Sequence, residues 1–156
     1  MSGPLWVEHR RTCFAYSAGG HKAELDRLTA DMVFTDRFDV TYRSGRPPDP
    51  RARRTWYLVH PRRRPLRTLV NVLQALWVVL RERPELVIST GADVAVATVV
   101  WARLFGARVV FVECAGRVGP SLSGRLVYPF ADLFVVQWPE QKLCYPRAVL
   151  ARGALL

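Results

Sequence analysis

Short apolar runs alternate with longer segments of helical periodicity along most of this chain. The short runs have the length of strands and are bounded by polar, glycine or proline residues, whereas the longer segments repeat apolar residues every three or four positions. The pattern predicts strands at the run that begins at Thr12 and at Phe38–Tyr42, Thr55–His60, Leu86–Ser89, Arg108–Glu113 and Leu133–Gln137. It predicts helices over Ala23–Val33, Leu66–Leu80, Val94–Phe105 and Ser121–Ala131.

Strands that alternate with helices through short loops indicate an α/β protein. We expect a single Rossmann-like domain over residues 1–156, with a mostly parallel sheet and helices on both of its faces. Ligands of such sheets bind beyond the carboxyl ends of the strands. This edge would collect four loops, which are Ser17–His21, Thr90–Asp93, Glu113–Ser123 and Gln137–Glu140.

The loop after the first strand is a candidate phosphate site. Gly19 and Gly20 allow a tight turn and a close approach to a ligand, and the following helix directs its free N–H groups at the same spot. An anion fits this arrangement, and His21 is the imidazole placed to contact it or to transfer a proton. The alternative is structural, with Ser17 as a helix cap and Glu24 as a first-turn acid.

The helix predicted at Leu66–Leu80 is the most apolar segment, and its narrow polar stripe runs through Arg67, Asn71 and Gln74. Its length of about 22 Å is short of the ~30 Å hydrocarbon core of a bilayer. With arginines at both ends it suits a peripheral position on anionic lipid. A helix that covers a parallel sheet has the same composition. The predicted membrane contacts are Leu69, Leu73, Leu76, Trp77 and Leu80.

Composition adds a strong positive charge to this picture. Half of the residues are hydrophobic, which excludes a disordered chain, and the net charge of +10 favours anionic partners. Between Arg43 and Arg67, nine arginines face a single acid, Asp49, in a segment whose prolines predict a surface loop. A nucleic-acid-binding module is one alternative, but no known recognition motif accompanies the arginines, so we expect no nucleic-acid partner.

The cysteines and the amino terminus indicate the compartment. Cys13, Cys114 and Cys144 lack the spacing of metal ligands, so we predict buried thiols in a reducing compartment and neither a metal nor another cofactor. The first residues contain no apolar signal-peptide core, so we expect a cytoplasmic protein.

From Val109 onward the motifs resemble one family of proteins. They are Glu113, Arg117, Ser121–Gly124, Tyr128, Ala131-Asp132, Gln137–Glu140 and Tyr145-Pro146, preceded by Ser17, Gly19, Gly20, His21 and Glu24. The set resembles the acceptor-side subunits of split GT-B glycosyltransferases. These are bacterial polysaccharide and capsule biosynthesis proteins, related to the membrane-anchoring subunit of the eukaryotic dolichol-linked GlcNAc transferase. Cys114 departs from the family, which has serine there.

The resemblance implies the amino-terminal half of a GT-B fold and a membrane-recruiting subunit that binds a lipid-linked saccharide in polysaccharide biosynthesis. A partner chain would bind the nucleotide-sugar, and this chain would be inactive alone. Without the anchoring helix of the eukaryotic relative, it would be peripheral on the cytoplasmic face of the membrane. Gln137, Trp138, Pro139, Glu140 and Tyr145 are predicted to form the partner interface.

The resemblance also implies roles for the loop residues. Ser17, Gly19, Gly20, His21, Gly91, Arg117, Ser121 and Ser123 would hold the substrate and its phosphates. Glu113 is expected to be the base that deprotonates the acceptor hydroxyl, with His21 as its rival. Structural alternatives remain: a Glu113–Arg117 ion pair, serines that only cap helices, and aromatic residues that belong to the core. A complete small nucleotide-binding enzyme is a further alternative, although the loop lacks the G-x-G-x-x-G pattern.

Overall fold

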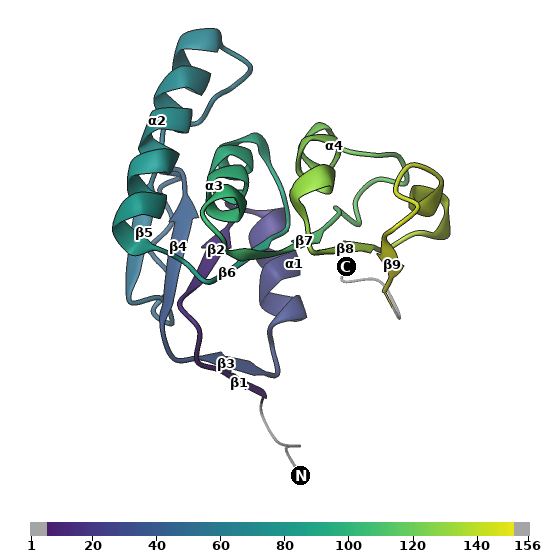
Figure 1. Ribbon diagram of the computed structural model, residues 1–156, viewed down its shortest axis with the longest axis horizontal. Coiled ribbons are helices and arrows are strands. Elements are labelled where there is room, and N and C mark those ends of the chain that lie inside the picture. The colour runs from purple at the N-terminus through teal and green to yellow at the C-terminus, as the bar shows by residue number, and fades with distance from the viewer. Residues whose placement is uncertain (1–5, 152–156) are drawn as a thin grey trace.

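A computed structural model describes residues 6–151 and shows a parallel α/β domain (Figure 1). Its main sheet has seven strands in the order β5-β4-β2-β6-β7-β8-β9, and every neighbouring pair is parallel. The strands are β2 Thr12–Ala15, β4 Arg37–Thr41, β5 Arg54–Tyr57, β6 Leu86–Ser89, β7 Arg108–Val112, β8 Leu133–Val136 and β9 Val149–Leu150. The predicted fold class is therefore confirmed.

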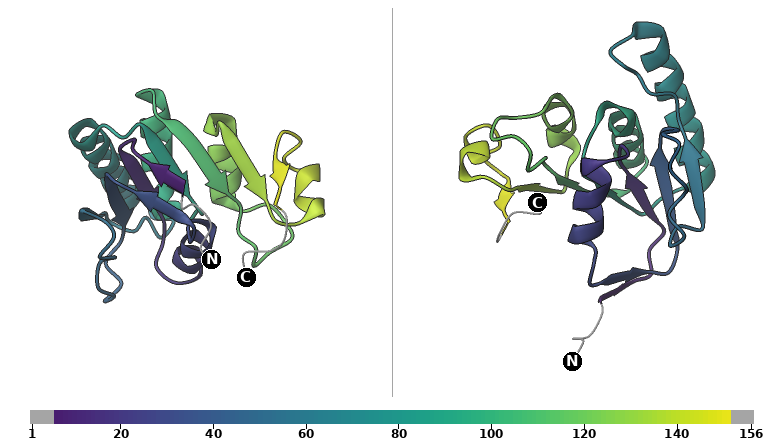
Figure 2. Two further views of the ribbon diagram at one scale, coloured as in Figure 1. Left: turned by 90° about the horizontal axis from the view of Figure 1, so that it is seen from below. Right: turned by 180° about the vertical axis from the view of Figure 1, so that it is seen from behind.

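Helices cover both faces of this sheet, as Figures 1 and 2 show. The helix α1 (Gly20–Leu28) lies on one face, and α2 (Pro65–Glu82), α3 (Asp93–Leu104) and α4 (Leu122–Val127) lie on the other. Each face has its own core. Leu25 packs with Phe14 and Ile88 under α1, while the larger core on the opposite face includes Val78, Val99 and Val127. Alternate residues of the central strands feed the two cores because both faces are covered.

Several element boundaries differ from those predicted. The first helix ends at Leu28, and Met32 begins the strand β3 (Met32–Phe34), which pairs in parallel with β1 (Trp6–Glu8). The predicted helix at 121–131 divides into α4 and the 3₁₀ helix η1 (Tyr128–Phe130) at Pro129, which has no N–H for an α-helical bond. The 3₁₀ helix η2 (Pro139–Leu143) and strand β9 were not predicted, because such short elements have no periodicity.

Candidate functional site

The site lies where the strand order changes direction, between β2 and β6. The chain fills one side of the sheet with β4 and β5 and then crosses to β6, so the loops after β2 and β6 diverge at the carboxyl edge. Ligands of open α/β sheets bind at such switch points. The loop after β2 carries Gly19 and His21, and the loop after β6 carries Thr90 and Gly91.

Two hydrogen bonds hold His21 against the neighbouring loop. Its Nδ1 lies 2.8 Å from the carbonyl oxygen of Thr90, and Thr90 Oγ1 donates to the carbonyl oxygen of His21 at 2.7 Å. Because a carbonyl oxygen only accepts, Nδ1 carries a proton and donates it. In neutral His21 the other ring nitrogen, Nε2, is therefore an acceptor. This orientation suits an imidazole that takes a proton from a hydroxyl group.

The glycines place backbone close to His21. Gly19 has φ +101° and forms the N-cap of α1 without a side-chain hydrogen bond, so the alternative in which Ser17 caps this helix is wrong. Gly91 has φ +104°, and a Cβ added there would lie 3.3 Å from Ser123 Oγ and 3.7 Å from His21 Cε1. Gly91, His21 and Ser123 thus meet at one spot, beside the uncapped N-terminus of α1.

Glu113 lies at the same edge, but the residue is only 1% exposed, and its carboxylate accepts hydrogen bonds from inside the fold. Its Oε1 accepts from the Cys114 backbone N–H at 2.9 Å. Its Oε2 accepts from the Ser121 N–H at 3.1 Å and from the Tyr145 hydroxyl at 2.8 Å. Both oxygens are engaged, so the folded chain offers neither of them to an incoming hydroxyl. This geometry favours a positioning role for Glu113.

The expected alternative of a Glu113–Arg117 ion pair is wrong. The side chain of Arg117 is exposed and forms no ion pair within residues 6–151. Ser121 caps α4 by accepting from the Gly124 N–H at 2.8 Å, as the capping alternative predicted. The oxygen atoms of Ser121 and Ser123 lie 3.3 Å apart. Burial raises the pKa of the Tyr145 hydroxyl, and its hydrogen bond to Glu113 raises that pKa further.

The residues predicted to contact a partner divide into two groups. Gln137 and Tyr145 are buried, and Gln137 Nε2 donates to the Glu113 carbonyl oxygen at 2.8 Å. Trp138 is half-buried, and its Nε1 donates to the Ala115 carbonyl oxygen at 2.8 Å. Pro139 and Glu140 are exposed on η2. Thus Gln137 and Trp138 stabilise the loop that follows Glu113, whereas Pro139 and Glu140 face outward.

The buried Gln141 was not predicted as a site residue. Its Oε1 accepts from the backbone N–H groups of Gln137 and Trp138, and its Nε2 donates to the carbonyl oxygens of Cys114 and Arg117. It therefore ties η2 to the loop after β7. No spacing in the sequence marks it, because all four bonds go to backbone atoms.

His21, Glu24 and Cys114 lie together between α1 and the loop after β7. They offer ligand atoms within 4.8 Å of one another, an arrangement that could hold a metal ion. Glu24 Oε1 accepts from the Ala115 N–H at 3.0 Å, so this acid braces the loop. Burial raises the pKa of the Cys114 thiol, and the charge of Glu24 adds to the effect.

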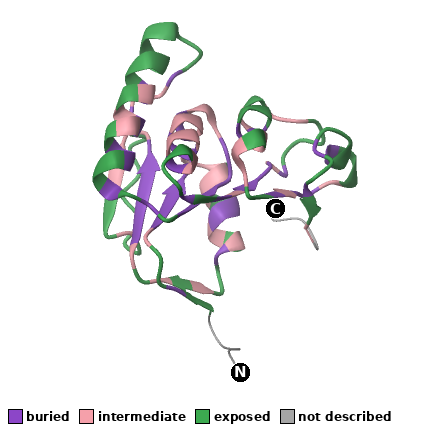
Figure 3. Cartoon of the chain, in the orientation of Figure 1, coloured by how far each residue is buried: buried purple, intermediate pink, exposed green. Residues whose placement is uncertain are grey.

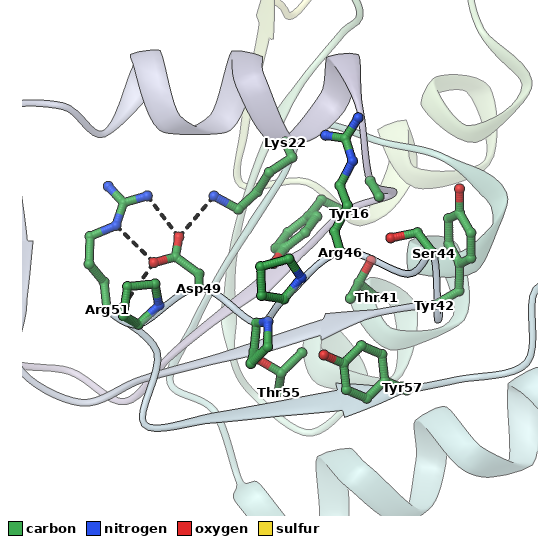
Figure 4. Close-up of a pocket in the computed structure, with 14 residues that line it drawn as sticks. Tyr16, Lys22, Thr41, Tyr42, Ser44, Arg46, Asp49, Arg51, Thr55 and Tyr57 are labelled. Carbon is green, nitrogen blue, oxygen red and sulfur yellow. Dashed lines mark hydrogen bonds and ion pairs between the residues drawn. The ribbon is translucent and has the colours of Figure 1, made fainter.

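A separate hollow of about 540 Å³ lies under the proline-rich loop, between α1 and the ends of β4 and β5 (Figure 4). Asp49 anchors this loop by accepting hydrogen bonds from Lys22, Arg37 and Arg51. Burial alone would raise the pKa of Asp49, but the hydrogen bonds from Arg51 and Lys22 outweigh it and hold the pKa well below its usual range. Part of the arginine-rich segment therefore stabilises the loop.

Four further arginines lie at the other end of that segment. Arg62, Arg63, Arg64 and Arg67 are exposed and form no ion pair within the described part of the chain. They lie at the start of α2, where the helix extends beyond the sheet (Figures 1 and 3).

In addition to the side that packs Val78 and Val79 into the core, α2 has an apolar side that faces outward. Two residues of its predicted polar stripe point into the protein, whereas Arg67 is exposed. Asn71 Nδ2 donates to the Val59 carbonyl oxygen, and Gln74 Oε1 accepts from the Val59 N–H. Of the predicted membrane contacts, Leu69, Leu73, Trp77 and Leu80 are 48–56% exposed, and Leu76 is half-buried. Leu66 and Val70 extend this exposed apolar side of α2. No helix within residues 6–151 has both the length and the apolar character needed to span a bilayer.

Known structures share this architecture. MurG of Acinetobacter baumannii superimposes with a TM-score of 0.68 at 15% sequence identity, over 92% of this chain and 45% of that chain. The strand order and this likeness define a Rossmann-like domain with the fold of one half of a GT-B protein.

Sequence comparison gives the family. The model for "Oligosaccharide biosynthesis protein Alg14 like" matches residues 50–155. The chain is 31% identical over 145 residues to the UDP-N-acetylglucosamine transferase subunit ALG14 of Homo sapiens, a match that covers 81% of this chain and 65% of the human protein. The chain belongs to the family of Alg14-like oligosaccharide biosynthesis proteins, and the resemblance in its motifs is confirmed.

Two further relatives match shorter segments. The ALG14 subunit of Eremothecium gossypii is 43% identical over 76 residues, which are 44% of this chain and 34% of that protein. The UDP-N-acetylglucosamine–N-acetylmuramyl-(pentapeptide) pyrophosphoryl-undecaprenol N-acetylglucosamine transferase of Clostridium novyi is 33% identical over 76 residues, which are 49% of this chain and 21% of that protein. The chain thus spans about two thirds or less of the length of these relatives.

Proposed function

We propose that this chain is the acceptor-side subunit of a two-chain glycosyltransferase, which transfers a sugar from a nucleotide-sugar to a lipid-linked saccharide. The observation that carries the proposal is the GT-B-type domain with His21 and a glycine loop at its switch point. The relatives support it by name, as transferase subunits and as an enzyme acting on a pyrophosphoryl-undecaprenol saccharide. Assays of sugar transfer by the chain alone and with a donor-binding partner test it.

In this proposal the acceptor pyrophosphate lies at the N-terminus of α1, where the helix dipole favours an anion. The acceptor hydroxyl attacks the anomeric carbon of the donor sugar, and the bond from that carbon to the donor diphosphate breaks. We assign the proton of the hydroxyl to Nε2 of His21, because Thr90 holds the opposite nitrogen. Glu113 then positions the N-terminus of α4, which carries Ser121 and Ser123.

The partner would contact the outer surface of η2 and β9. Pro139 and Glu140 are exposed there, and Leu143, Val149 and Leu150 expose 85%, 52% and 39% of their surface. An apolar patch rimmed by polar residues is typical of a protein interface. Polysaccharide or capsule synthesis on the cytoplasmic face of a membrane is the setting that we propose.

Peripheral membrane binding through α2 is a further part of the proposal. The outer leucines and Trp77 would enter the interface, while the arginines at 62–67 would contact anionic headgroups. We expect vesicles that contain anionic lipid to sediment the protein, and we expect a higher salt concentration to weaken the binding.

The matched variants for this test are Leu73→Ser on the outer face and Val33→Ser on the exposed strand β3. Leu73→Ser should weaken vesicle binding several-fold, because an apolar contact with the interface is lost, and Val33→Ser should not. Equal sedimentation on neutral and anionic vesicles would show that the arginines do not contact the lipid.

A further inference from the structure

A groove of about 550 Å³ lies between α2, α3 and α4. Apolar side chains dominate its lining, which includes Val72 from α2, Val96, Ala97, Val100 and Trp101 from α3, and Leu126 from α4. Its volume is within the range of small-molecule sites. Water molecules form few hydrogen bonds with an apolar lining, so their displacement by an apolar ligand is favourable.

One end of the groove opens at the proposed reaction site. Ser123 and Asp93 line this end, together with Arg63 from the loop before α2. Ser123 Oγ also lies within 3.4 Å of the Ala92 backbone N–H, and a Cβ added at Gly91 would touch both Ser123 and His21. A ligand with its phosphates at the N-terminus of α1, beside His21, could therefore continue directly into the apolar groove.

The charge at this end fits the same ligand. The exposed side chain of Arg63 lines it, and the Asp93 carboxylate lies 3.5 Å from the His60 imidazole. The groove thus offers an arginine to a pyrophosphate at one end and an apolar interior to the hydrocarbon chain that is joined to it.

We infer that this groove binds the hydrocarbon chain of the acceptor lipid, next to its pyrophosphate. The inference rests on the proposed function and adds a subsite to it. The groove is separate from the outer face of α2, which carries Leu69, Leu73 and Trp77 and faces away from the protein. The chain of the lipid would pass between α2 and α4 before it reaches the membrane.

The test compares two soluble probes by calorimetry with the full chain: phytanyl-pyrophosphoryl-GlcNAc below its micelle concentration, and methyl-pyrophosphoryl-GlcNAc. The phytanyl probe should bind at least about tenfold more tightly, because each buried methylene adds to the affinity. Val100→Phe, which fills the groove, should abolish this preference and leave the affinity for the methyl probe unchanged. Val33→Phe on β3 is the matched control and should change neither affinity.

Each other outcome overturns a defined part of the account. Equal affinities of the wild-type chain for the two probes would contradict binding of the hydrocarbon chain in the groove but would leave the proposed function standing. If Val100→Phe still prefers the phytanyl probe, the inference is also overturned. If Val100→Phe does not fold, the same criterion applies to the milder variant Ala97→Leu. Displacement of the phytanyl probe by the donor-binding partner would assign the groove to that partner. Binding of neither probe would contradict the proposed function itself.

Discussion

Replacing His21 with alanine is expected to lower kcat of the assembled transferase by roughly 10²–10⁴-fold, the usual contribution of a general base. The KM for the acceptor should change much less, because the N-terminus of α1 and the loop glycines still bind the phosphates. The physical reason is the Thr90 carbonyl, which fixes the proton on Nδ1 and leaves Nε2 to accept one. Steady-state kinetics with varied acceptor concentration measure both constants.

The division of the effect between kcat and KM separates a base from a phosphate contact. If His21 is the base, His21→Ala lowers kcat and leaves the acceptor KM close to that of the wild type. His9→Ala is the matched control, since His9 is exposed before β2, at the opposite end of that strand. A His21→Ala variant with a higher acceptor KM and a near-normal kcat would instead make His21 a phosphate ligand.

Substitution of Gly124 by alanine is expected to cost about 3 kcal/mol of unfolding free energy, at the upper end for overpacking a buried site. A Cβ at this position would lie 2.1 Å from Glu113 Oε2, 2.6 Å from the Tyr145 hydroxyl and 2.9 Å from Ser121 Oγ. The Tyr145 hydroxyl donates to Glu113 Oε2, and the Gly124 N–H donates to Ser121 Oγ. Moving any of these groups away from the added Cβ would break a buried hydrogen bond. Urea unfolding at a constant m-value measures the loss.

Gly119→Ala is the control for this substitution. A Cβ there would meet no atom within 4 Å, and Gly119 is not among the glycines with positive φ. Its unfolding free energy should stay within about 0.5 kcal/mol of that of the wild type. If Gly124→Ala were equally stable, the Glu113 carboxylate could not be packed against α4 as the structure shows.

The fold could be predicted because strands and helices of ordinary length carry their own periodicity. Leu86–Ser89 was located to the residue, and α2 extends only slightly beyond its predicted range. The strands β1, β3 and β9 were missed, since two or three residues show no alternation and depend on partners elsewhere in the chain.

The site was predictable only in part. The glycine loop and His21 follow one another in sequence, so local spacing is enough to detect them. The burial of Glu113 depends on Tyr145, which lies 32 residues away, and this contact exists only in the folded chain. For the same reason, the sequence could not show that Asn71 and Gln74 point inward and leave the apolar face of α2 exposed.

In the proposed function this chain binds the acceptor and a partner chain binds the nucleotide-sugar. A transfer assay tests this requirement for two chains most directly. Labelled UDP-N-acetylglucosamine and a pyrophosphoryl-lipid saccharide would be incubated with this chain, with a purified donor-binding partner, and with both. We predict transfer only in the mixture, and a loss of transfer in the mixture that contains His21→Ala. Sustained transfer by this chain alone, at a rate that the partner does not change, would contradict the account.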